Sequence, residues 1–172
     1  VIFGDGYCSG PNQVKLGVID KDFRDYFAGI SEAWLGIRPN SHEYIRRGKL
    51  YYEAHINSRD VRNFVFDFLK CKNVPKEIMV SKDERIKCMF IKGFSDSEGT
   101  ISEQCIRIYN KNLPLLKSVK ELFIDIGFDS KYVRCGYHGR GIYATYIYRH
   151  SFKIFKEKIG FTINRKKEKL EE

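Results

Sequence analysis

The chain has 172 residues, 42% hydrophobic and 15% aromatic, so it can bury a core and is not a disordered basic tail. Lysine and arginine number 31 against 22 aspartate and glutamate, which gives a formal net charge of +9. A folded, aromatic-rich, basic protein favours a polyanionic partner, and nucleic acid is the leading candidate. Charge alone leaves a merely basic soluble protein as the alternative.

The cysteines are five, scattered, and contain no C-x-x-C pair: Cys8, Cys71, Cys88, Cys105 and Cys135. This pattern argues against a zinc site and against a disulfide framework. It predicts reduced cysteines in an intracellular protein, cytoplasmic or, in a eukaryote, organellar. No apolar run has the length of a membrane span, and no secretory signal is visible. The four histidines (His42, His55, His138 and His150) show no metal-ligand spacing along the sequence.

The first part of the chain shows two hairpins, each followed by an amphipathic helix. In chain order these are a hairpin over 7–19, a helix over 22–35, a hairpin over 40–58 and a helix over 60–68. Gly10-Pro11-Asn12 predicts the first turn, and Gly36 ends the first helix. Residues 71–82 are predicted to be a linker with a short helical turn after Pro75.

The second part begins with a helix over 83–99, whose apolar and small residues recur at three- and four-residue steps. It continues with extended chain over 100–109, a helix over 112–126, a hairpin over 131–149, a helix over 151–159 and a charged tail over 165–172. Glu98 falls in the last turn of the first of these helices, where the helix dipole disfavours an acid. Such a conflict with the local rule is expected at a functional site.

The two parts repeat at a period of roughly 90 residues. The opening stretch 1–6 ends small–acid–Gly, as does 90–99, so that Asp5 matches Glu98. The same register matches Lys21 with Lys111, Ile56 with Ile147, Val61 with Phe152 and Phe64 with Phe155. We therefore predict an α+β, pseudo-twofold tandem repeat of helix–hairpin–helix–hairpin–helix, with halves 1–82 and 83–172. The chain starts inside what should be the first helix of the first half, so we expect residues before Val1.

The stretch Phe90–Gly99 resembles the LAGLIDADG motif, and Val1–Gly6 resembles the end of a first copy, with Phe3 where the motif usually has Asp. The chain is thus similar to the single-chain, two-motif LAGLIDADG homing endonucleases of introns and inteins. The resemblance implies two antiparallel saddle-shaped sheets with helices packed behind them, in a monomer. It also implies site-specific cleavage of both strands of a long DNA target, leaving short 3′ overhangs.

Cutting two strands requires divalent cations on the scissile phosphates, and the resemblance points to the repeated acids, Asp5 and Glu98, as catalytic metal ligands. The backbone carbonyls of Gly4 and Ser97 are expected to complete the set. Hard oxygen ligands suit Mg²⁺, which needs only one or two carboxylates. Two crossing helices would bring the acids together, where the cations activate water and stabilise the leaving oxygen. Ca²⁺ is expected to bind as a non-catalytic substitute.

Two lysines follow basic strands and are predicted to stabilise phosphate charge or tune the attacking water: Lys21 and Lys111. The residues directly before them, Asp20 and Asn110, are predicted to order solvent around the site. In the family, the residue at Asp20 is often a polar amide, so its carboxylate is a further candidate metal ligand.

DNA reading is assigned to the hairpins, because a twisted antiparallel sheet fits the major groove. Strand alternation predicts groove-facing side chains at Lys15, Glu53, His55 and Asn57 in one half, and at Arg107, Tyr109, Tyr146 and Tyr148 in the other. Hairpin tips are predicted to contact phosphates through Arg46, Arg47, Lys49, His138 and Arg140. Since matched positions differ between the halves, the DNA target should be asymmetric.

Two other functions fit the same scaffold. A non-cleaving, RNA-binding intron maturase would keep the basic surface but could dispense with the acids, and a transcription regulator is the more distant alternative. The presence of both Asp5 and Glu98 favours the nuclease. Binding to duplex DNA or to structured intron RNA, with and without Mg²⁺, would separate these functions.

Overall fold

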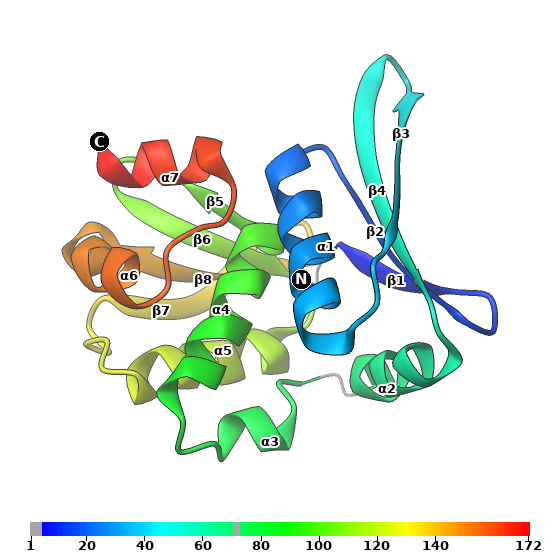
Figure 1. The fold of residues 1–172 in the computed structure, drawn as a ribbon. Coiled ribbons are helices and arrows are strands. Elements are labelled where there is room, and N and C mark those ends of the chain that lie inside the picture. The colour runs from blue at the N-terminus through cyan, green and yellow to red at the C-terminus, as the bar shows by residue number, and fades with distance from the viewer. Residues whose placement is uncertain (1–4, 71–72) are drawn as a thin grey trace. The chain divides into compact units, whose positions relative to one another are not determined.

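The computed structural model describes the backbone of residues 5–70 and 73–172, and the side chains of these residues except 68–70 (Figure 1). The chain divides into two compact units, Val1–Lys70 and Cys71–Glu172. Residues 73–82, assigned from the sequence to a linker at the end of the first half, are part of the second unit. None of the helices in the described residues is long and apolar enough to cross a membrane.

The first unit is a four-stranded antiparallel sheet with two helices (Figure 1). Its elements are β1 (Gly6–Ser9), β2 (Gln13–Val18), α1 (Lys21–Leu35), β3 (Asn40–Arg46), β4 (Lys49–Asn57) and α2 (Arg59–Lys70). The strand order is β1-β2-β4-β3, so β3 is an edge strand that pairs with β4. The helices cover one face because β2 and β4 alternate buried apolar residues with polar ones.

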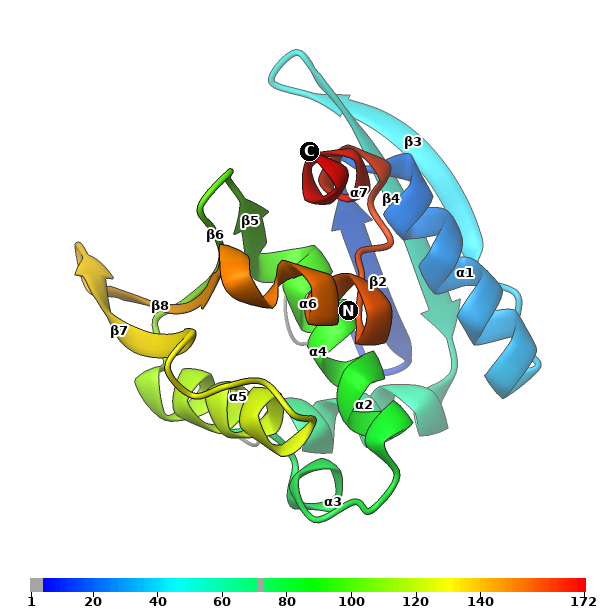
Figure 2. The same cartoon turned by 90° about the vertical axis from the view of Figure 1, so that its left-hand side faces the viewer.

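The second unit has the same architecture with additional helices (Figure 2). Its elements are α3 (Lys76–Met79), α4 (Glu84–Glu98), β5 (Gly99–Ile101), β6 (Cys105–Asn110), α5 (Leu113–Asp125), β7 (Val133–Gly139), β8 (Ile142–Tyr148), η1 (Arg149–Ser151), α6 (Phe152–Lys158) and α7 (Asn164–Glu171). The strand order is β5-β6-β8-β7. The core of this unit surrounds α5. Its side chains are at most 2% exposed at Leu116, Phe123, Phe155 and Phe161.

The two sheets have identical topology and matching register, so the α+β tandem repeat predicted from the sequence is confirmed. Val14 pairs with Ile56 in the first sheet, and Ile106 pairs with Ile147 in the second. These pairs make Ile56 and Ile147 equivalent, as the sequence repeat requires. Residues 1–4, on which the end of a first motif helix was predicted, lie outside the described residues.

Two stretches differ from their predicted forms. The segment 100–109, predicted as extended chain, is a hairpin of β5 and β6. At its turn, the backbone N–H and the hydroxyl of Ser102 both donate to the carbonyl of Cys105, and the Ser102 hydroxyl oxygen accepts from the Cys105 N–H. The charged tail over 165–172 belongs to α7, and Lys166 on this helix is only 3% exposed. The many charged residues of this segment predict a solvated tail from composition alone. Burial of the Lys166 side chain instead holds the helix on the second unit.

The apolar helix faces of the first unit are less buried than their spacing predicts. Phe23 and Phe27 are buried, but Trp34 is 83% exposed and Phe64 is 64% exposed. These two aromatic side chains line a cavity of about 690 Å³ between α1 and α2.

Gly99 marks the junction of α4 and β5, but for a different reason from the one that the sequence suggests. Helix-ending glycines usually adopt a positive φ, as Gly36 does at 64°. Gly99 is instead extended, with φ −91° and ψ 145°. A Cβ at this position would collide with the backbone carbonyl of Ser95, so the chain can leave α4 directly into β5 only without a side chain.

We expect Gly99→Ala to lower the free energy of unfolding by about 1–3 kcal/mol, because the strand must shift away from the helix end. Denaturant unfolding of the purified chain measures this loss. Gly29→Ala is the matched control, because a methyl group added to Gly29 on α1 would meet open space. That variant should gain about 0.5–1 kcal/mol from the better helix propensity of alanine. Equal stability of Gly99→Ala and the wild type would contradict the close approach.

Candidate functional site

Glu98 is the last residue of α4 and is half-buried beside the junction with β5. The preceding residue, Ser97, donates a side-chain hydrogen bond of 2.9 Å to the carbonyl of Gly93. The carbonyl of Ser97 belongs to the last turn of the helix and directly precedes Glu98. The end of α4 therefore presents a carboxylate and a backbone carbonyl as neighbouring oxygen donors.

Buried polar contacts fix the last turn of α4 within the second unit. The ammonium group of Lys166 donates to the carbonyls of Ser95, at 3.1 Å, and of Asp96. The Asp96 carboxylate, 1% exposed, accepts backbone hydrogen bonds from Thr162 at 2.9 and 3.0 Å and from Ile163 at 3.4 Å. A cation at a helix C-terminus offsets the negative end of the dipole. Asp96 and Lys166 thus both support the helix end, and the charged residues that surround Lys166 along the chain gave no sign of this role.

Asp5 occupies the corresponding place in the first unit. In that unit Gly6 pairs with Leu16, and in the second Gly99 pairs with Ile108. Because Leu16 and Ile108 are equivalent in the two sheets, Asp5 and Glu98 each directly precede the first strand of their sheet. Asp5 is exposed, and Gly4, predicted to contribute a carbonyl, lies outside the described residues.

The two predicted lysines do not hold equivalent positions. When the register of the two sheets is continued along the chain, Lys21 of the first unit is equivalent to Leu113 of the second. Lys111 of the second unit is equivalent to Ile19 of the first. Lys21 begins α1 and pairs with Asp25 at 2.6 Å, and this hydrogen bond is the main cause that lowers the pKa of the Asp25 carboxyl. Lys111 is exposed in the connection between β6 and α5.

The helix N-caps that follow these strands are Asp20 and Asn112, and they are the equivalent pair. Asn112 caps α5 by accepting from the backbone N–H of Leu115 at 3.2 Å. Asp20 holds the N-cap position of α1 without a side-chain capping hydrogen bond. Asn110, predicted to order solvent beside Lys111, accepts from the backbone N–H of Asn112 at 2.9 Å. The sequence alignment of Asp20 with Asn110 is therefore displaced by two residues.

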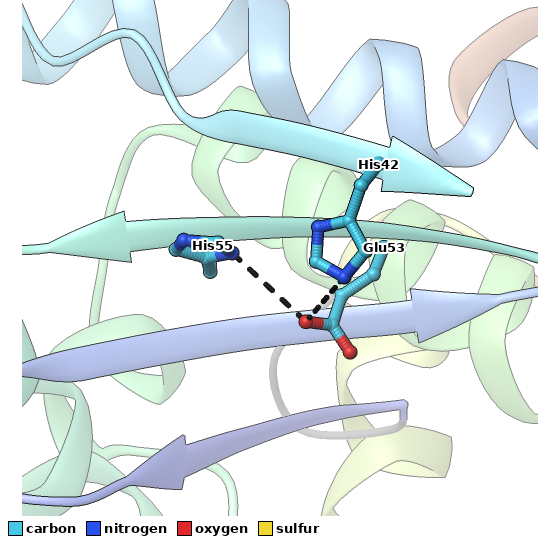
Figure 3. A group of neighbouring side chains, drawn as sticks. All are labelled: His42, Glu53 and His55. Atoms are coloured by element: carbon cyan, nitrogen blue, oxygen red, sulfur yellow. Dashed lines mark ion pairs between the residues drawn. The ribbon is translucent and has the colours of Figure 1, made fainter. Parts of the chain in front are cut away.

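The polar face of the first sheet contains the four residues predicted from alternation: Lys15, Glu53, His55 and Asn57. Glu53 is only 7% exposed, and Lys15 Nζ lies 3.4 Å from its Oε1. His42 Nε2, from the edge strand, lies 3.3 Å from the same oxygen (Figure 3). Burial first, and the Glu53 charge second, raise the pKa of Tyr7 on this face. Asn57 accepts from Gln13 at 2.9 Å.

The polar face of the second sheet is rich in tyrosine and arginine: Arg107, Tyr109, Tyr146 and Tyr148. Contacts with Tyr109 first and Cys105 second raise the pKa of the Arg107 guanidinium. Burial is the main cause that raises the pKa of Tyr146, followed by the charge of Tyr109. Tyr146 and Tyr148 stack with ring centroids 6.4 Å apart. These half-buried planar rings and this guanidinium are groups that can stack on bases and bond to base edges.

The hairpin tips are basic and exposed, with one correction. Arg46, Arg47 and Lys49 surround the β3–β4 turn, where Arg47 and Gly48 have φ of 52° and 73°. Arg140 occupies the β7–β8 turn with φ 51°. His138, predicted at that tip, lies on the sheet face instead, because its Nδ1 is 2.9 Å from the Tyr146 hydroxyl and its ring contacts Tyr109. A register shift interrupts the pairing of β7 with β8 between Tyr137 and Gly139, next to His138.

Comparisons with known proteins support the resemblance that the motifs suggest. Residues 85–160 match the family model of a LAGLIDADG-like domain. A protein of Methanocaldococcus jannaschii, the uncharacterized protein MJ0398, is 29% identical over 193 residues, which cover 99% of this chain and 68% of that protein.

Solved structures match nearly the whole chain. The homing endonuclease I-DmoI in complex with DNA and Mn is 19% identical, with a TM-score of 0.68 over 92% of this chain and 90% of that one. I-WcaI bound to its DNA recognition sequence is 14% identical, with a TM-score of 0.58 over 98% and 81%. Full-length DUF199/WhiA from Thermatoga maritima is 14% identical, with a TM-score of 0.67 over 99% of this chain and 55% of that one. The chain therefore has the fold of these homing endonucleases, and residues 85–160 are similar to a LAGLIDADG-like domain.

We expect Lys166→Met to lower the free energy of unfolding by about 1–3 kcal/mol, because two carbonyls at the end of α4 lose their buried donor. Methionine retains most of the volume, so the loss reports the polar contact. Lys167→Met is the matched control, since Lys167 is the next residue of α7 and is exposed. Thermal and denaturant unfolding measure both variants. A loss shared equally by the two would show that net charge, and not this contact, is responsible.

Proposed function

We propose that this chain is a divalent-metal-dependent, site-specific endonuclease that cuts both strands of an asymmetric DNA target. The observation that carries the proposal is the repeated acid–glycine step at the start of each sheet. Asp5-Gly6 and Glu98-Gly99 enter their sheets in the same register. A repeat of matched acids is what a two-strand cleavage reaction requires, since each strand needs its own hydrolytic group.

The donor groups at these positions fit Mg²⁺. The end of α4 offers the Glu98 carboxylate and the Ser97 carbonyl, and hard oxygen donors of this kind suit a cation that keeps several waters. Asp5 and the carbonyl of Gly4 would be the matching ligands of the first half. A bound divalent cation would lower the pKa of its bound water and would stabilise the negative charge on the leaving oxygen. I-DmoI structures that the fold matches were solved with Mn, with Ca and with Mg.

The remaining predicted residues would contact the phosphates and the base edges of the DNA. Lys111 is exposed beside the second sheet, where its ammonium group can stabilise phosphate charge. Lys21 would have to leave Asp25 to take the same role in the first half. The polar sheet faces would read base edges, and the hairpin tips would bind phosphates through Arg46, Arg47, Lys49 and Arg140. The surplus of basic residues supplies the sequence-independent part of the affinity. We infer that the protein acts as a monomer, in which each half contacts its own part of the target.

A second candidate function is binding without cleavage. The match to DUF199/WhiA shows that this fold also occurs in a protein whose name does not describe a nuclease. A maturase or a transcription regulator would use the same basic faces, but would place no chemical demand on Asp5 and Glu98. Substitution of these acids therefore separates catalysis from binding.

Glu98→Gln and Asp5→Asn should each abolish cleavage and leave duplex binding intact, because each removes one charge without changing volume. The target is first selected by cleavage of a duplex library of candidate intron-insertion junctions in Mg²⁺. The rate loss should exceed about 100-fold, the upper range for loss of a group that only orients a metal ligand. Glu121→Gln, an exposed acid on α5, is the matched control and should cut at the wild-type rate. Wild-type turnover in Glu98→Gln would refute the assignment, and selective binding of structured RNA with no DNA cleavage would favour the maturase.

Lys111→Met should reduce the cleavage rate by about 100-fold while changing affinity far less, as expected for a group that stabilises developing charge. Single-turnover cleavage and duplex binding, measured on the same target, give the two quantities. Lys117→Met, which removes an exposed lysine from α5, is the control for the loss of one positive charge. Equal losses of rate and affinity in Lys111→Met would make this lysine a phosphate anchor only.

A further inference from the structure

The polar face of the first sheet brings together three side chains from two strands: His42, Glu53 and His55 (Figure 3). His42 comes from the edge strand β3, and the other two come from β4, where His42 and Glu53 are directly paired. We propose that these residues bind one divalent transition-metal ion, for which Zn²⁺ is the best-suited candidate. This site would be separate from the hydrolytic acids and does not depend on the proposed nuclease activity.

The spacing of the donor atoms agrees with a shared metal. His42 Nε2 lies 3.3 Å from Glu53 Oε1, and His55 Nδ1 lies 3.9 Å from the same oxygen. The ligand atoms of the three residues all lie within 4.8 Å of one another. Bonds of about 2.0–2.1 Å in tetrahedral geometry place zinc ligands about 3.3 Å apart. Small side-chain rotations would bring His55 from its present distance to that value.

A hydrogen-bonded histidine–glutamate pair is the competing explanation, and it accounts for only part of the cluster. It explains His42, whose side chain is 49% exposed and whose Nε2 is close to Glu53. It does not explain His55, whose Nδ1 is buried and has no hydrogen-bond partner among the described residues. Its distance of 3.9 Å from the Glu53 oxygen is too long for a hydrogen bond, and a buried imidazole nitrogen without a hydrogen bond is costly. A metal ion would satisfy both nitrogens and the carboxylate together.

The donor set selects the class of ion. Two imidazole nitrogens and one carboxylate oxygen suit Zn²⁺ and other first-row transition metals, whereas Mg²⁺ and Ca²⁺ prefer oxygen alone. Three protein ligands leave a fourth position for water or for a group on a partner. Lys15 is the competing cation, because its Nζ lies 3.4 Å from the Glu53 oxygen that the metal would use. The long lysine side chain is 22% exposed, so it can move to solvent when the metal binds.

Metal binding would have a specific mechanical effect on this sheet. The edge strand β3 is joined to the sheet through its ladder with β4. A metal bound by His42 on one strand and by Glu53 and His55 on the other would cross-link the two. The β3–β4 hairpin also carries the basic tip Arg46–Lys49, so the cross-link would restrain the direction of that tip.

The test is a Zn²⁺ titration of the full 172-residue chain after removal of metal by a chelator, in competition with a chromophoric zinc indicator. We expect one equivalent of Zn²⁺ to bind, and His42→Gln, Glu53→Gln and His55→Gln each to weaken binding by more than about tenfold. His150→Gln is the matched control, because this exposed histidine belongs to the second unit, where it stacks on Tyr132, and its loss should leave binding unchanged. Co²⁺ should give visible d–d bands without a sulfur-to-cobalt charge-transfer band.

The proposal is overturned if the wild type binds no Zn²⁺ at stoichiometric protein concentration. It is also overturned if the three variants bind as the wild type does, or if Co²⁺ shows thiolate ligation, which would assign the metal to cysteines. Circular dichroism confirms that each variant is folded before titration. His42→Gln is the decisive variant, because its half-exposed side chain on an edge strand contributes least to the core. DNA cleavage assays are not needed, so the result is independent of the nuclease proposal.

Discussion

The buried ammonium group of Lys166 binds the C-terminal end of α4, and the packing of the C-terminal segment on the second unit depends on this contact. Lys166 bonds the carbonyls of Ser95 and Asp96, while the Asp96 carboxylate bonds the backbone of Thr162 and Ile163. The last turn of the helix and the C-terminal segment are thus joined in both directions, by a cation to carbonyls and by an anion to N–H groups. This offsets the dipole cost of placing Glu98 at the same helix end. The carboxylate that we propose as a metal ligand is thereby held on a rigid element.

The sequence predicted most of the fold because its signals are local. Alternation along β2 and β4 assigns their faces, and glycines at positions such as Gly36 and Gly127 adopt the positive φ that ends a helix. It could not predict α7, since burial of Lys166 follows from carbonyls on another helix. It misaligned Lys21 with Lys111, because a match of residue type outweighed the strand register, which only pairing reveals.

The sequence likewise predicted only part of the candidate site. The repeated acid–glycine step is visible in the sequence, and strand pairing places both copies in one register. The His42–Glu53–His55 cluster is not visible, because metal-ligand spacing along one chain cannot show a contact across two strands. Glu53 also shows the limit of alternation, which correctly assigns its face but not its burial behind Lys15 and His42.

The two sheets share one topology but carry different chemistry on their polar faces. The first gathers Lys15 and two histidines around the Glu53 carboxylate, whereas the second presents Arg107 among tyrosines. Identical backbones would present these groups at equivalent places on a duplex, so each half would favour different bases at matched positions. A palindromic target would satisfy one face and leave unpaired groups on the other. Divergence of the side chains on a duplicated scaffold is therefore the physical reason to expect an asymmetric target.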